Sequence, residues 1–175
     1  ILWVALCAAC SPTYNWREVR PAELPVAVML PDKPDALTQR VRLDGLELPM
    51  SMSGAKVSEA MFTVACAQLP DDQPATRERV LAAMRAGMVR NIAGVEDKAD
   101  LVKVRLIDAA GNQTGLLDGR SIRVQGKAQG RAVRMQALFV GLGRRACQAV
   151  ALGADLPDDE AKVFIDSVRL IAGRD

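Results

Sequence analysis

The densest run of chemically active side chains lies between Gly119 and Ala154, where basic residues follow one another with no acid between them. They are Arg120, Arg123, Lys127, Arg131, Arg134, Arg144 and Arg145. Guanidinium groups suit phosphate and carboxylate because they present a planar fork of donors. In an extended chain Arg123 and Lys127 share one strand face, opposite Ile122 and Val124. We interpret the run as an anion-binding face or, alternatively, as a solvated face that keeps the sheet soluble.

The cysteines are the second group that could do chemistry, and Cys66 and Cys147 both fall in strand-like runs. In an oxidising compartment such an even pair can form a disulfide that joins two strands. The alternative is two separate buried thiols that pack as small hydrophobes. Two cysteines in a chain without histidine leave a zinc coordination shell half empty, so we predict no metal site and no cofactor.

An apolar run over residues 1–9 ends in Ala8-Ala9-Cys10 and is followed directly by polar chain. This pattern resembles the cleavage site of a bacterial lipoprotein signal peptide. The resemblance implies that residues 1–9 are a signal-peptide remnant, that Cys10 carries the lipid (palmitate among its chains), and that residues 10–24 form a tether. By resemblance to bacterial lipoprotein sorting, Ser11 after the cysteine favours the outer membrane, facing the periplasm, over the inner membrane. An ordinary signal peptide and an uncleaved anchor helix are the alternatives.

Composition excludes several function classes. The chain contains no histidine, which is the commonest general base and metal ligand. Net charge is only +2, and the aromatic residues after Trp16 are Phe62, Phe139 and Phe164 alone, so nucleic-acid binding is not expected. A hydrolase would need a serine and lysine pair, for which Ser51, Ser53 and Ser58 near Lys56 are the candidates. We predict a non-enzyme and keep a hydrolase as the weakest alternative.

Hydrophobic periodicity predicts strands separated by two helices. The expected strands cover residues 26–30, 38–43, 46–52, 62–69, 101–107, 122–124, 133–139 and 144–152. One helix is expected after Asp71, with Leu81, Met84, Met88 and Ile92 as its buried stripe, and another after Pro157. This order predicts an α+β fold in which helices flank an antiparallel sheet, as one domain over residues 25–175.

The same order resembles the Mog1/PsbP-like fold, and in particular its DcrB-type bacterial lipoproteins. The residues that carry the resemblance lie between 25 and 171: Leu30-Pro-Asp-Lys-Pro34, residues 62–70 before the long helix, residues 119–124, residues 139–150, and the closing helix over 163–170. The resemblance implies an α/β/α sandwich and an accessory module without a shared active site. Cys66 and Cys147 stand where the family pattern has tyrosine, and two such departures on facing strands strengthen the disulfide interpretation.

Together these features predict a lipid-anchored cell-envelope protein. We expect a non-catalytic accessory or binding module in an outer-membrane or periplasmic assembly, with an envelope protein or an anionic lipid as its partner and no nucleic acid. The alternative is a lipid- or lipopolysaccharide-handling protein that uses the basic sheet face for phosphates. Oligomeric state stays open.

Overall fold

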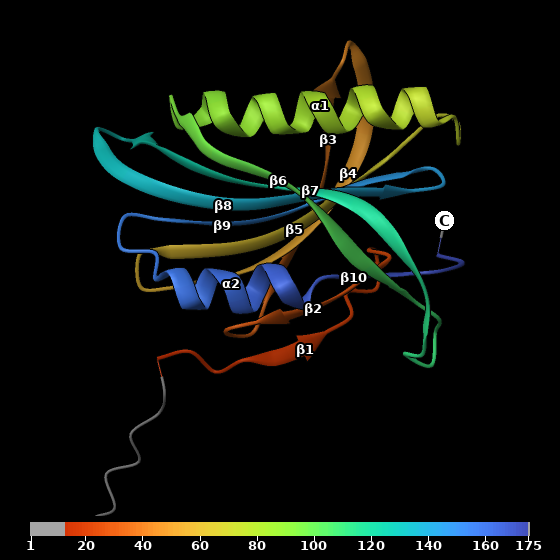
Figure 1. The fold of residues 1–175 in the computed structure, drawn as a ribbon, viewed down its shortest axis with the longest axis horizontal. Coiled ribbons are helices and arrows are strands. Elements are labelled where there is room, and N and C mark those ends of the chain that lie inside the picture. Colours follow the sequence, from red (N-terminus) through yellow and green to blue (C-terminus); the bar gives the residue numbers. More distant parts are fainter. Residues whose placement is uncertain (1–12, 175) are drawn as a thin grey trace, which may run out of the picture.

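The computed structural model of the chain describes residues 13–174 (Figure 1). In chain order its elements are β1 (Arg17–Val19), β2 (Val26–Leu30), β3 (Asp35–Leu43), β4 (Leu46–Val57), β5 (Ala60–Gln68), α1 (Pro74–Asn91), β6 (Val95–Ile107), β7 (Gln113–Ala128), β8 (Arg131–Leu142), β9 (Arg145–Gly153), α2 (Asp158–Ser167) and β10 (Arg169–Ile171).

All ten described strands belong to one sheet, in the order β1-β2-β10-β6-β7-β8-β9-β5-β4-β3. Every neighbouring pair is antiparallel except β10 and β6, which are parallel. The two longest strands, β6 and β7, form a hairpin that crosses the front of the molecule in Figure 1. Register shifts at Glu96/Lys98 and Leu106/Ile107 interrupt this hairpin, and such bulges increase local twist.

The sheet curls around α2. Val26 and Val28 of β2 lie in the same buried cluster as Phe62 of β5, although several strands separate β2 from β5 in the sheet order. Phe164 of α2 is fully buried in this cluster and meets the Phe62 ring edge to face, with 5.5 Å between centroids. Only a curled sheet can bring both ends of this face onto one short helix (Figure 1).

The opposite face of the sheet packs against α1. Val80 and Met84 of the helix are buried against Met50, Ile122 and Phe139 from β4, β7 and β8. The Asp71 side chain accepts hydrogen bonds from the Gln73 amide and the Thr76 hydroxyl at the start of the helix, where free amide groups need partners. The helix therefore begins close to the predicted position.

The expected fold class, an α+β fold in which helices flank the sheet as an α/β/α sandwich, is wrong. The described chain is mostly strand, and its two helices each cover only part of a ten-stranded curled sheet. The physical reason is strand length: β6 and β7 extend well beyond the expected 101–107 and 122–124, through polar residues with no clear alternation. Their hairpin pairing satisfies the backbone groups there, and the long twisted strands close the core themselves.

Residues 14–24, which the sequence assigns to the tether, pack on this core. β1 pairs with β2, and Leu24 is buried. Trp16 meets Phe62 edge to face at 5.6 Å and donates from Nε1 to the Glu160 carboxylate at 2.8 Å. The packed domain therefore begins at least ten residues before position 25.

Candidate functional site

Strand alternation divides the seven basic residues between the two faces of the sheet. Arg120 shares the α1 side with Ile122, whereas Arg123 and Lys127 lie on the α2 side. On β8, Arg131 lies on the α1 side with Val133, and Arg134 lies on the α2 side. The structure therefore does not gather the run into one anion-binding face.

Several of these residues are used by the fold itself. Arg134 donates to the Leu156 carbonyl at 2.5 Å and pairs with Asp158 at 3.3 Å, which ties β8 to the start of α2. Arg131 pairs with Glu59 at 3.4 Å, and Arg144 donates to the Leu69 carbonyl at 3.1 Å. Arg145 is the first residue of β9 and lies on the same strand face as Cys147.

Arg123 sits in a hollow between the sheet and α2. Two adjoining parts of this hollow, of about 260 and 110 Å³, share Lys98, Arg123 and Gln136 in their walls. Gln136 lies directly across from Arg123 in the β7–β8 register and is 8% exposed. Sequence analysis missed Gln136, although a polar residue inside the apolar run 135–140 is a signal that could have found it.

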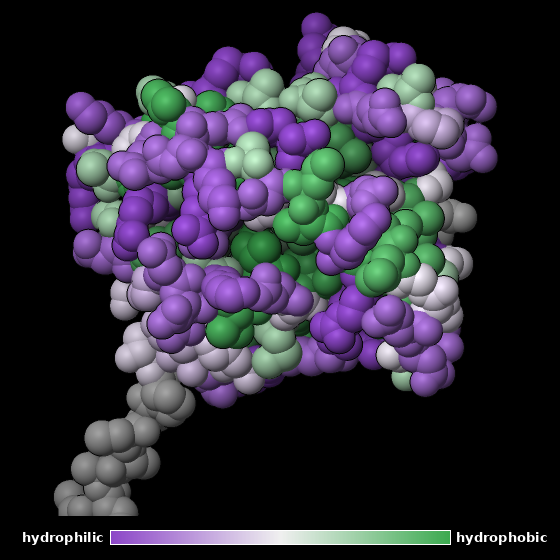
Figure 2. All heavy atoms as spheres, viewed as in Figure 1, coloured by the Kyte–Doolittle hydropathy of each residue, from purple (hydrophilic) through white to green (hydrophobic). Residues whose placement is uncertain are grey.

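A larger groove of about 520 Å³ lies on the α1 side, between α1 and the β6–β7 hairpin. Leu81 of the helix and Phe139 of β8 line it together with Leu101, which is 75% exposed. Arg120 and Asp118 supply charge from β7. Figure 2 shows apolar side chains gathered over the β6–β7 region, between the two helices of Figure 1.

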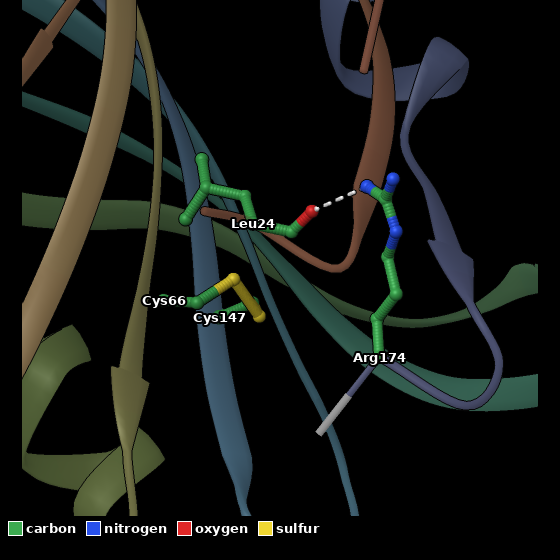
Figure 3. The surroundings of a disulfide bond; sticks show 4 residues. All are labelled: Leu24, Cys66, Cys147 and Arg174. Atoms are coloured by element: carbon green, nitrogen blue, oxygen red, sulfur yellow. Dashed lines mark hydrogen bonds between the residues drawn. A yellow bond between two sulfur atoms is a disulfide. The ribbon is translucent and has the colours of Figure 1, made fainter. Parts of the chain in front are cut away.

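Cys66 and Cys147 are joined by a disulfide (Figure 3). They face each other in the β5–β9 register, with 4.0 Å between their Cα atoms, and both are buried. The sequence leaves open a disulfide or two separate buried thiols, and the structure has the disulfide. The bridge links positions 81 residues apart in the chain, inside the core around α2.

The serine and lysine candidates for a hydrolase are not brought together. Ser53 and Lys56 have the S-x-x-K spacing of some serine hydrolases, a match that sequence analysis missed. On a strand, however, positions three apart point to opposite faces, and both residues lie in β4. Ser53 is buried, while Ser51 is hydrogen-bonded to Thr38 at 3.0 Å.

Electrostatic effects are clearest where the N-terminal strand joins the fold. Hydrogen bonds from Arg169 and Arg20 lower the pKa of Glu18 below its usual range. Burial raises the pKa of Tyr14, and the nearby negative charge of Glu160 adds to that rise. The Glu18–Arg169 pair fastens β1 to β10, and the hydrogen bond from Trp16 to Glu160 ties the residue before β1 to α2.

Cys10 and residues 1–9 lie outside the described residues. In the part that the structure describes, no helix is long and apolar enough to cross a membrane. The same part holds no cluster of three or more Asp, Glu, Cys or His side chains that could bind a metal ion.

Comparison with known proteins identifies no family. No family model matches the chain, and no curated protein matches it. Among solved structures, the chain is similar to PA94, a Pseudomonas aeruginosa protein of unknown function, with a TM-score of 0.40, 9% identity and coverage of 80% of this chain and 83% of that one. It is also similar to the apo form of the type VI secretion immunity protein TplEi from the same organism, with a TM-score of 0.37, 18% identity and coverage of 73% of this chain and 46% of that one.

Proposed function

We propose that the chain is a lipid-anchored cell-envelope protein that acts as a non-catalytic binding module in an outer-membrane or periplasmic assembly. The observation that carries this proposal is the disulfide between Cys66 and Cys147. Structural disulfides persist in oxidising compartments such as the periplasm and are rare in the reducing cytosol. A buried bridge of this kind therefore supports an exported protein, as does the lipoprotein-like sequence ending at Cys10.

Two features support a binding role. The hollow beside α2 presents Arg123, which has no ion-pair partner within residues 13–174, and the groove beside α1 presents Arg120, which has none there either. Both hollows open to solvent next to apolar side chains, which is the usual composition of a ligand or partner site.

Metabolic labelling with an alkyne palmitate analogue tests the anchor. Cells expressing the wild type, Cys10→Ala and Cys7→Ala are compared, and Cys7 serves as the matched control because it lies three residues away. We expect the label in the wild type and in Cys7→Ala, and its loss in Cys10→Ala together with release from the membrane fraction. An unchanged amount of label in Cys10→Ala would contradict the proposal that the chain is a lipoprotein.

The second candidate function is lipid handling, and the groove beside α1 supports it. A volume of about 520 Å³ falls within the range of small-molecule sites, and Leu81, Leu101 and Phe139 give it an apolar lining. Lipid extracted from the purified protein would be identified by mass spectrometry for the wild type, Leu101→Asp and Leu116→Asp. Leu116 is an exposed apolar residue outside the groove. Loss of bound lipid in Leu101→Asp alone supports this function, and absence of lipid from the wild type contradicts it.

A further inference from the structure

Gln136 is a largely buried polar side chain that lines the hollow beside α2. It is 8% exposed, lies on the α2 side of β8, and its side chain makes no hydrogen bond within the part of the chain that the structure describes. A primary amide offers two donor hydrogens and a carbonyl acceptor. The Gln136 amide is not among the fully enclosed polar atoms of residues 13–174, so it reaches the open space of the hollow. The side chain lines both parts of the hollow beside α2, so a ligand there can satisfy it.

Arg123 supplies the matching charge. It lies opposite Gln136 in the register, on the same face of the sheet, and lines the same two spaces. Lys98, Arg134 and Lys162 also line the hollow, but each is paired with a carboxylate: Asp100 at 3.1 Å, Asp158 at 3.3 Å, and Asp166 respectively. Of the four cations, Arg123 is the one without a partner in residues 13–174.

The charge balance of the hollow selects the kind of anion. Its carboxylates are Asp97, Asp100, Asp158 and Asp166, which equal its cations in number. Three of those carboxylates are held in ion pairs with three of the cations, which leaves the Arg123 guanidinium and the Asp97 carboxylate without an ion pair within residues 13–174. A carboxylate brings one negative charge and fits the guanidinium fork with two parallel hydrogen bonds. A phosphate dianion would bring a second charge next to four acidic side chains with no free cation to balance it.

We propose that this hollow is a carboxylate-binding site in which Arg123 binds the carboxylate and the Gln136 amide donates a hydrogen bond to it. Ser121 lines the hollow on the same strand face and can donate a further one. The carboxylate can come from a small acid or from an acidic side chain of a partner protein. The inference deepens the proposed binding function but does not depend on the lipid anchor, so a failure of the labelling test leaves it standing.

Nuclear magnetic resonance titration of the isotope-labelled full chain tests the site. Sodium acetate, sodium phosphate and tetraglutamate are added separately at constant ionic strength, and the side-chain amide signals of Gln136 and the Nε–H signal of Arg123 are followed. We expect acetate and tetraglutamate to shift both signals in a saturable way, and phosphate to bind more weakly. If tetraglutamate binds with the same affinity per carboxylate as acetate, the site takes a small acid. If tetraglutamate binds much more tightly than acetate, the site takes an acidic segment of a partner protein.

Three variants make the test specific. Arg123→Gln is expected to weaken acetate binding about tenfold or more, because a charge-assisted hydrogen-bonding pair is lost. Lys127→Gln is the matched control, since it lies on the same strand and the same face as Arg123, has no ion pair within residues 13–174 and lines neither part of the hollow. Gln136→Met keeps the buried volume, so it is expected to weaken binding while the protein remains folded. Acetate shifts that persist in Arg123→Gln, or phosphate binding tighter than acetate binding, would overturn the proposal.

Discussion

The two sides of the curled sheet are built differently. Around α2, the sheet encloses a core with a disulfide and with aromatic contacts from Phe62 to both Trp16 and Phe164. Around α1, the core is made mainly of aliphatic and methionine side chains and ends in an open groove beside Leu101. The difference teaches that curvature decides how much a helix contributes to the core. The sheet itself surrounds α2 and leaves the smaller hollow beside Arg123, whereas α1 lies across the sheet and leaves the larger groove.

Substitutions that create a cavity should show the largest difference in unfolding free energy between the two sides of the sheet. Phe164→Ala removes a fully buried ring that the curled sheet cannot collapse onto, and we expect it to cost about 4 kcal/mol of unfolding free energy. Met84→Ala on α1 should cost about 2 kcal/mol, because a helix at an open edge can relax into the space. Urea denaturation followed by circular dichroism measures both values. A larger loss for Met84→Ala would contradict the assignment of the stiffer core to the α2 side.

Removal of the disulfide should cause the next largest loss of unfolding free energy. The double variant Cys66→Ala/Cys147→Ala loses a crosslink between residues 81 positions apart, and we expect a loss of about 3 kcal/mol. The wild type in excess dithiothreitol is the control and should show a similar shift in its urea midpoint. If neither the variant nor the reduced protein is destabilised, the bridge does not hold the α2 side together.

The N-terminal segment should have a smaller effect on the same side. Trp16→Phe keeps a ring against Phe62 but removes the indole hydrogen bond to Glu160, and we expect a loss of about 1 kcal/mol. Tyr14→Phe is the control because the Tyr14 hydroxyl has no hydrogen-bond partner in the described chain. Equal and negligible effects of both changes in a thermal melt would show that residues 14–24 are a tether after all.

The smallest expected effect is a pH dependence at β1. The folded-state pKa of Glu18 lies below its value in the unfolded chain, mainly because Arg169 hydrogen-bonds its carboxylate. The stabilisation is therefore full above the ordinary glutamate pKa of about 4.3 and is lost as pH falls through the lower folded-state pKa. Glu18→Gln should flatten the unfolding free energy against pH in this acidic range. If the slope of unfolding free energy against pH is unchanged in Glu18→Gln, solvent screens the ion pair between Glu18 and Arg169 completely.

Local features of this fold could be predicted from sequence to different degrees. The expected strands 38–43 and 46–52 pair as a hairpin, and the two residues between them, Asp44 and Gly45, both take positive φ, as an Asp-Gly turn favours. Strand β2 was predicted with its observed bounds, since a continuous apolar run ends at Pro31. The sequence does not predict β1 and β10, because a strand of three residues is too short to show hydrophobic periodicity. Their pairing depends on contacts with distant parts of the chain.

The candidate site was only partly predictable for a related reason. Alternation placed Arg123 and Lys127 on one face, and the structure has them there. The same rule could not place Arg131, Arg134, Arg144 and Arg145 relative to them, because the register between strands was unknown. Gln136 can be recognised as a site residue only from the pairing of β7 with β8, which brings it opposite Arg123.

The most direct test of the central claim, that this chain works in an oxidising envelope compartment, is the redox state of Cys66 and Cys147 in living cells. Intact cells are quenched in acid, and free thiols are blocked with a maleimide–polyethylene glycol reagent before and after reduction. The account predicts that Cys66 and Cys147 react only after reduction, with a two-step mobility shift. In Cys66→Ser the remaining Cys147 thiol should react without reduction and give a single step. Both thiols reacting before reduction would contradict an exported, disulfide-bonded module.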